Sequence, residues 1–165
     1  MIRPRRVRSL LAALLPALVL LMGQTLVAHA KDIIGTAQDA GTFTILLQAM
    51  KAAGLNEVLM QPGPITLFAP TDDTFAKLPR ESLQNLLRPE NKEKLKAILT
   101  YHLVDGKATS RDFLGKRLEA ATMQGGSLLI DATKGVTVDN AKVIKADIVA
   151  DNGFIHVIDT VMIPK

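Results

Sequence analysis

The chain has 165 residues, with 20 Lys and Arg against 16 Asp and Glu, no Cys, no Trp and a single Tyr. Without cysteine it forms no disulfide, carries no cysteine-linked lipid and offers no thiolate to a metal ion. The whole basic excess lies among the first eight residues, so the remainder is balanced in charge. The basic total therefore does not indicate a nucleic-acid-binding protein.

Residues 1–30 are typical of a secretory signal peptide. Four arginines precede an apolar run from Leu10 to Met22, and the segment closes on a small-x-small sequence at Ala30. The apolar run is shorter than the roughly 17 to 25 residues that cross a membrane. We expect cleavage after Ala30, leaving residues 31–165 secreted into a periplasm or beyond the cell, without a stable membrane anchor.

Helical periodicity dominates the first half of this remaining chain. In GTFTILLQAMKAAG the apolar residues fall at helical spacing, with Thr42 predicted as the N-cap and Gly54 as the stop. The stretch LPRESLQNLLRPENKEKLKAILTYH predicts two helices separated at Pro89. The apolar stripe of the second helix ends at His102, so we expect this histidine to face the core.

Between these helices, TLFAPTDDTFAKLP combines a short strand, ended by Pro70, with the acidic pair Asp72 and Asp73. Two catalytic carboxylates must face one substrate atom and have pKa values set apart by their surroundings. Adjacent residues at a helix start point in different directions, whereas an oxygen there accepts the free N–H groups of the first turn. We therefore predict that Thr71, Asp72 or Asp73 caps a short helix.

From Leu118 onward the period of the apolar residues falls to two. LEAATM, SLLIDA, VTVDN, KVIKADIVA and FIHVIDTVMI are predicted strands, separated by turns that contain Gly and Asn. Short strands that follow a helical block predict a single α+β domain built on a small sandwich or barrel.

Two histidines, His102 and His156, lie beyond residue 30. Asp105, Asp151 or Asp159 would in principle complete a metal site with them. Both histidines fall on apolar faces, so we predict core residues with backbone or side-chain partners, and no metal or other cofactor. The chain has no G-x-S-x-G elbow and no phosphate-binding Gly-Lys-Ser/Thr loop, so we expect no catalysis.

Three blocks of the sequence together resemble the signature blocks of the fasciclin domain. They are TLFAPTDDTFAKLP, LKAILTYHLVDGK and ADIVADNGFIHVIDTVMIP, in the order and spacing of that family. The resemblance covers residues 31–165 as one copy, and it implies a wedge of short β-strands with helices packed alongside. It also implies an extracellular or periplasmic module for cell adhesion and surface interaction.

In animal fasciclin domains, a Tyr-His pair and an Asp-Ile pair are implicated in integrin binding. By this resemblance, the predicted partner-binding residues are Tyr101, His102, Asp147 and Ile148. The expected partner is a protein or glycan at a cell surface or in a matrix. The chain departs from the family at Asp105, where a proline is frequent, and in the residues that precede Asp147, so an integrin itself is not the expected partner.

Three alternatives remain open. A small-ligand carrier would use an apolar cleft between the helices and the strands. A hydrolase would need His102 or His156 exposed and within hydrogen-bond reach of an acid. Finally, a buried His102 would support binding only by stabilising the fold.

Overall fold

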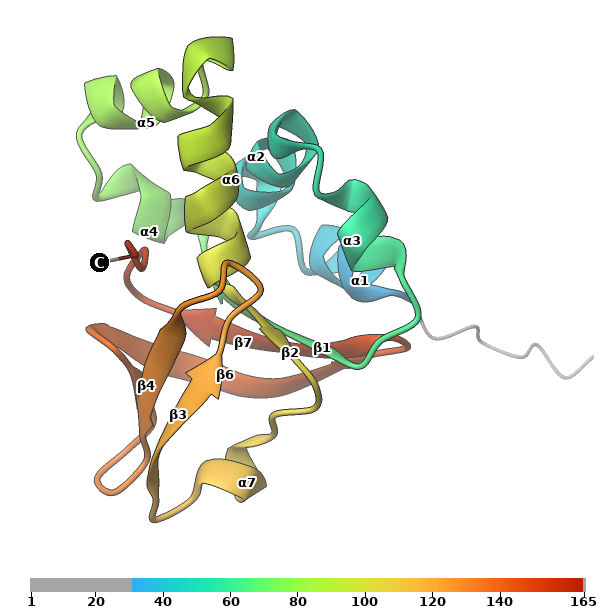
Figure 1. Cartoon of the computed structure of the whole chain (residues 1–165), viewed down its shortest axis with the longest axis vertical. Coiled ribbons are helices and arrows are strands. Elements are labelled where there is room, and N and C mark those ends of the chain that lie inside the picture. The colour runs from blue at the N-terminus through green and yellow to red at the C-terminus, as the bar shows by residue number, and fades with distance from the viewer. Residues whose placement is uncertain (1–30, 165) are drawn as a thin grey trace, which may run out of the picture.

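The computed structural model describes residues 31–164, so the predicted signal peptide lies outside the described residues. The helices are α1 (Ile33–Ala40), α2 (Thr44–Ala53), α3 (Asn56–Met60), α4 (Asp72–Ala76), α5 (Arg80–Leu86), the 3-10 turn η1 (Pro89–Asn91), α6 (Lys92–Tyr101) and α7 (Ser110–Phe113). The strands are β1 (Ile65–Pro70), β2 (Leu103–Asp105), β3 (Arg117–Ala121), β4 (Ser127–Asp131), β5 (Thr137–Val138), β6 (Ala141–Ala150) and β7 (Gly153–Ile158). All helices except α7 gather on one side of the strands (Figure 1). The predicted α+β class is confirmed.

The strands form one seven-stranded sheet in the order β2-β1-β7-β6-β5-β4-β3. β1 and β7 run parallel, and every other neighbouring pair is antiparallel. Val104 of β2 also forms an isolated bridge with Thr122, directly after β3. The two ends of the sheet therefore meet, and the sheet curls into a flattened barrel.

The sheet separates two apolar cores. The helix-side core packs α1, α2 and α6 against one face of the central strands and includes Leu46, Leu67 and Ile155. The barrel-side core lies inside the curled sheet and includes Phe68 and Leu128. Leu67 and Phe68 are neighbours on β1 whose side chains point to opposite faces, which is why this fully buried strand serves both cores.

The acidic pair lies at a helix start, as predicted. Thr71 is the N-cap of α4, and its hydroxyl accepts a hydrogen bond from the Thr74 N–H at 3.2 Å. Asp72 and Asp73 form the first turn of α4, where the helix dipole favours negative charge. The pair is therefore structural.

Asp72 has a second role that the sequence did not reveal. Its carboxylate accepts hydrogen bonds from the Thr44 N–H at 3.1 Å and the Ile45 N–H at 2.8 Å, at the start of α2. The prediction that Thr42 caps α2 is wrong, because Phe43 occupies the N-cap position and makes no side-chain cap bond. A carboxylate from a distant part of the chain caps α2 instead.

Most other predicted boundaries are confirmed. Gly54, at φ 74°, ends α2, and the chain between α5 and α6 breaks at Pro89. The strand predicted in FIHVIDTVMI ends early, at Ile158, and the carboxylate of the next residue, Asp159, accepts the Lys142 N–H at 2.8 Å. The short elements α1, α3, β2 and α7 were not predicted. None of the helices between residues 31 and 164 has the length and apolar character needed to span a membrane.

Candidate functional site

His102 closes α6 and lies in the core, with 1% of its surface exposed. Its Nδ1 lies 2.8 Å from the Ile98 carbonyl oxygen, and the Met162 N–H donates to its Nε2 at 3.1 Å. Nδ1 therefore carries the proton and the ring is neutral. Burial lowers the pKa of His102 to about 4, although the bond to Ile98 opposes this shift. The predicted core role of His102 is confirmed.

His156 is equally buried, in the barrel-side core. Its Nε2 lies 2.7 Å from the Ala108 carbonyl oxygen, and the Asp147 N–H donates to its Nδ1 at 3.3 Å. The ring stacks on Phe68, with centroids 5.4 Å apart, and lies 6.1 Å from Phe113. Burial lowers the pKa of His156, so this ring too is neutral near neutral pH. It ties the loop before α7 to β7.

The arrangement required by a histidine hydrolase is not met. Both histidines are buried, and in the part of the chain that the structure describes their ring nitrogens bond to backbone groups rather than to carboxylates. Across residues 31–164, no three His, Asp or Glu side chains lie together in a way that would hold a metal ion.

Tyr101 points into the barrel-side core, with 4% of its surface exposed. Its hydroxyl lies 2.7 Å from Asp139 Oδ2 and 3.1 Å from the Ser127 carbonyl oxygen. Burial, with the hydrogen bond and charge of Asp139, raises the pKa of Tyr101 to about 12. The hydroxyl lies at a polar hollow of about 380 Å³ whose lining includes Glu119 and Gln124. The ring supports the fold, and only its hydroxyl end approaches the surface.

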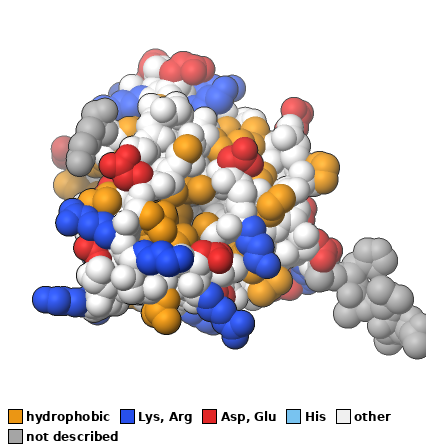
Figure 2. Space-filling view, turned by 60° about the horizontal axis from the view of Figure 1, so that its bottom comes forward, with side chains coloured by type: hydrophobic (Ala, Val, Ile, Leu, Met, Phe, Trp, Pro, Cys, Tyr) orange, Lys and Arg blue, Asp and Glu red, His pale blue; other side chains and the backbone are white. Residues whose placement is uncertain are grey.

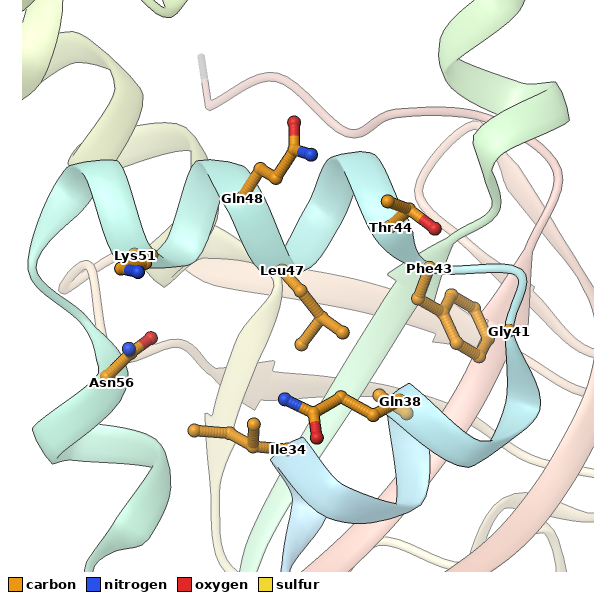
Figure 3. Close-up of a pocket in the computed structure, with 10 residues that line it drawn as sticks. Ile34, Gln38, Gly41, Phe43, Thr44, Leu47, Gln48, Lys51 and Asn56 are labelled. Carbon is orange, nitrogen blue, oxygen red and sulfur yellow. The ribbon is translucent and has the colours of Figure 1, made fainter.

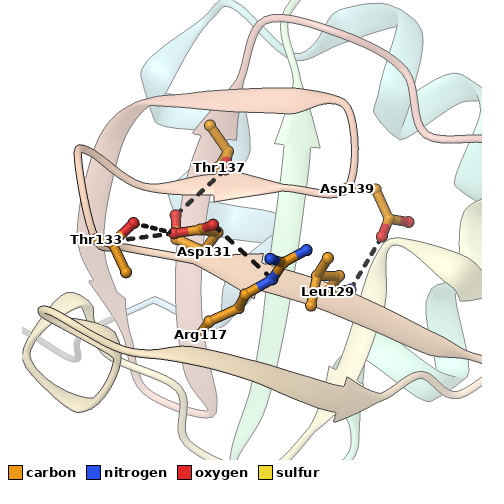
Figure 4. Close-up of polar contacts among 6 residues, drawn as sticks. All are labelled: Arg117, Leu129, Asp131, Thr133, Thr137 and Asp139. Carbon is orange, nitrogen blue, oxygen red and sulfur yellow. Dashed lines mark hydrogen bonds and ion pairs between the residues drawn. The ribbon is translucent and has the colours of Figure 1, made fainter.

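Figure 4 shows two aspartates, Asp131 and Asp139, with their polar partners near β4. The free oxygen of Asp139 accepts the Leu129 N–H at 2.9 Å and so holds the loop after β5 against β4. Asp131, at the end of β4, accepts the Thr133 N–H at 3.0 Å and lies 4.0 Å from the guanidinium of Arg117. Hydrogen bonds from Thr133 lower the pKa of Asp131. Both carboxylates therefore bond to neighbouring groups of the same domain and stabilise the strands.

Asp147 and Ile148 lie on β6 and are both half-buried. Asp147, at φ 58°, accepts hydrogen bonds from the backbone N–H of Ser110 at 2.8 Å and from the Ser110 hydroxyl. Burial alone would raise the pKa of Asp147, but these bonds from Ser110 lower it overall. Ile148 packs against the helix-side core. Asp147 thus joins α7 to β6, and it meets His156 rather than the Tyr101–His102 pair.

The side chain of Asn152 forms hydrogen bonds to distant parts of the chain, although its sequence context predicts only a turn. Its Oδ1 accepts the Ile33 N–H at 2.9 Å, at the start of α1. Its Nδ2 donates to the carbonyl oxygens of Leu59 at 2.5 Å and Gln61 at 3.1 Å, at the end of α3. One side chain therefore joins the β6–β7 turn to two helices. Asn-Gly in the sequence indicates the turn but gives no sign of these distant partners.

A groove of about 330 Å³ lies between α1 and α2, over the apolar side chains of Ile34, Phe43 and Leu47 (Figure 3). The carrier hypothesis expected a cleft between the helices and the strands, whereas this groove is lined by residues of α1, α2, the loop that joins them and α3, and by none from a strand.

The sequence profile of the fasciclin domain matches residues 41–164. The chain belongs to the fasciclin domain family. Protein sll1483 from Synechocystis is 45% identical over 144 residues, which cover 87% of this chain and 79% of that protein. The pig transforming growth factor-beta-induced protein ig-h3 is 36% identical over 136 residues, covering 79% of this chain and 20% of that protein.

The solved FAS1 domain pair of the insect cell adhesion molecule fasciclin I has the same fold. It superposes with a TM-score of 0.69 at 22% identity, over 81% of this chain and 51% of that chain. The three sequence blocks that resemble the family contribute β1, β2 and β7, which are neighbours in the sheet. In this fasciclin domain the blocks therefore encode three adjacent strands, including the parallel pair β1 and β7.

Proposed function

We propose that this fasciclin domain is secreted after removal of residues 1–30 and acts as an adhesion module, binding a protein or glycan at a cell surface or in a matrix. Membership of the fasciclin family is the observation that carries the proposal. The signal-like composition of residues 1–30 supports secretion. Further support comes from the shared fold of an insect cell adhesion molecule. The proposal involves no catalytic step.

The proposed contact surface centres on Asp147 and Ile148 of β6. Ile144 and Val149 of the same strand are 57% and 67% exposed, so β6 offers apolar side chains to a partner on either side of Asp147 and Ile148 in the sequence. On the side of the molecule seen in Figure 2, hydrophobic side chains lie between separate groups of both charges. A surface of this kind suits a mixed polar and apolar partner rather than a strongly charged polymer.

Tyr101 and His102 are proposed to support binding indirectly. With 4% and 1% of their surfaces exposed, they present almost no area to a partner. Their substitution is expected to weaken adhesion by destabilising the domain.

Affinity capture tests the proposal. Residues 31–165 are immobilised, and solubilised surface material from the producing cells and from host matrix is passed over them. We expect a saturable protein or glycan that a heat-unfolded domain does not retain. Val149→Ser should weaken its binding, whereas Met60→Ser, a change at a 59% exposed residue on α3, should not. Equal retention by the folded and unfolded domains would refute the proposal.

A further inference from the structure

The groove between α1 and α2 has an apolar floor, and small residues between the two helices leave it open. Ile34, Phe43 and Leu47 line it, and Figure 3 shows the Leu47 side chain pointing from α2 into the space above α1. Ala37 and Gly41 also line the groove. Their side chains are too small to fill the space between the two helices, so the hollow is left open.

The rim of the groove is polar and free of internal partners. It includes the side chains of Gln38, Gln48, Lys51 and Asn56. Among residues 31–164, none of these four side chains forms a hydrogen bond or an ion pair within the chain. Lys51 is the single charged group in the lining, because Asp39 of α1 lies outside the lining and pairs with Lys31 at 2.5 Å.

A lysine in the last turn of a helix needs no ligand by itself, because it offsets the helix dipole. Here, however, the lysine shares a concave apolar surface with three amides that have no internal partner. An apolar pocket with a few converging polar groups is the usual form of a small-molecule site. The amides supply donors and acceptors, and the lysine supplies a positive charge.

We propose that this groove binds a small amphiphilic carboxylate. The apolar body of the ligand covers Ile34 and Leu47, and its carboxylate lies at the Lys51 ammonium beside the rim amides. The volume of about 330 Å³ is at the lower end of the roughly 300 to 1,000 Å³ typical of ligand sites, which favours a short-chain ligand. The single cation favours one carboxylate over a polyphosphate, and the apolar floor disfavours a free sugar.

Octanoate is the probe for the test, with octanol as its uncharged counterpart. Backbone amide shifts of residues 31–165 are followed by NMR as each probe is added below its micelle concentration. We expect saturable octanoate-dependent shifts at Ile34, Leu47 and Lys51, and weaker binding of octanol. Shifts that do not saturate, or that map to another part of the molecule, would overturn the proposal.

Two variants separate charge from apolar contact. Lys51→Gln should weaken octanoate binding about two- to fivefold, as expected for a solvent-exposed ion pair, and leave octanol binding unchanged. Leu47→Ala should weaken both probes. Lys134→Gln, which makes the same change in net charge in the exposed turn after β4, is the matched control. Equal octanoate affinity for Lys51→Gln and Lys134→Gln would refute the assigned role of Lys51, and with it the proposed preference for a carboxylate.

Discussion

Acidification should destabilise the domain through His102, within a pH window that the structure defines. The ring is neutral in the folded state, where its pKa is lowered from 6.5 to about 4, chiefly by burial. The unfolded chain therefore takes up a proton at His102 before the folded chain does. The stability that this residue contributes is complete above its unfolded pKa and is lost as the pH falls from about 6.5 towards 4.

The expected loss follows from the size of the pKa shift. One pKa unit corresponds to about 1.36 kcal/mol, so the full shift at His102 corresponds to about 3 kcal/mol. At pH 5 the unfolded chain is almost fully protonated at His102, but this pH still lies above the folded pKa, so about 2 kcal/mol of the full amount should be lost between pH 7 and pH 5. Carboxylates add little to this loss, because the ordinary pKa values of Asp and Glu, about 3.9 and 4.3, lie below pH 5.

Urea unfolding of residues 31–165 at pH 7 and pH 5 measures this loss, with His102→Gln as the comparison. The variant should be less stable at pH 7, because the Met162 N–H and the Ile98 carbonyl lose their hydrogen bonds to the imidazole ring of His102. Its stability should nevertheless depend on pH less steeply than that of the wild type, by about 2 kcal/mol over the range. The residual slope belongs to His156. An equal pH dependence in the two proteins would refute the neutral, buried assignment of His102.

The remaining predictions concern turns, caps and the α7 contact. Gly153→Ala should cost at least about 3 kcal/mol, since a Cβ there would lie 1.8 Å from the backbone oxygen of Ile65, and chemical denaturation should show this loss; a mild effect would contradict the geometry. Asp72→Ala should cost about 1 kcal/mol through loss of the α2 cap, and Asp73→Ala much less, as measured by thermal unfolding. Asp147→Asn should speed amide hydrogen exchange at Ser110 and through α7 while leaving α6 protected; unchanged exchange in α7 would refute the pinning role of Asp147.

Periodicity and turn chemistry predicted the larger elements other than α1, because each has enough residues for a pattern. The short ones are hidden for local reasons. β2 has three residues and follows α6 immediately after His102, so no turn residue marks the change from helix to strand. α7 has four residues, too few for an apolar stripe, although the Thr109–Asp112 capping box was a readable signal for its start.

The structural roles of the candidate residues were predictable only where the signal is local. The apolar faces on which His102 and His156 fall correctly indicated burial. The cap that Asp72 gives to α2 and the bonds of Asn152 to α1 and α3 join residues far apart in the chain. Spacing along one sequence carries no trace of such contacts. The α1–α2 groove was unpredictable for a related reason, since it depends on how α1 and α2 lie against each other in the folded chain.

The central place of β7 sets the order in which this domain can be assembled. β1 pairs with β7 in a register that joins Ile65 to Gly153, so the middle of the sheet cannot form until a segment far later in the sequence than β1 has been made. Until then β1 lacks a neighbour on one side, and neither core can close. Such long-range pairing slows folding. For a chain exported as we propose, this delay would keep the polypeptide unfolded while it passes through a translocation pore, so that it folds only after it has crossed.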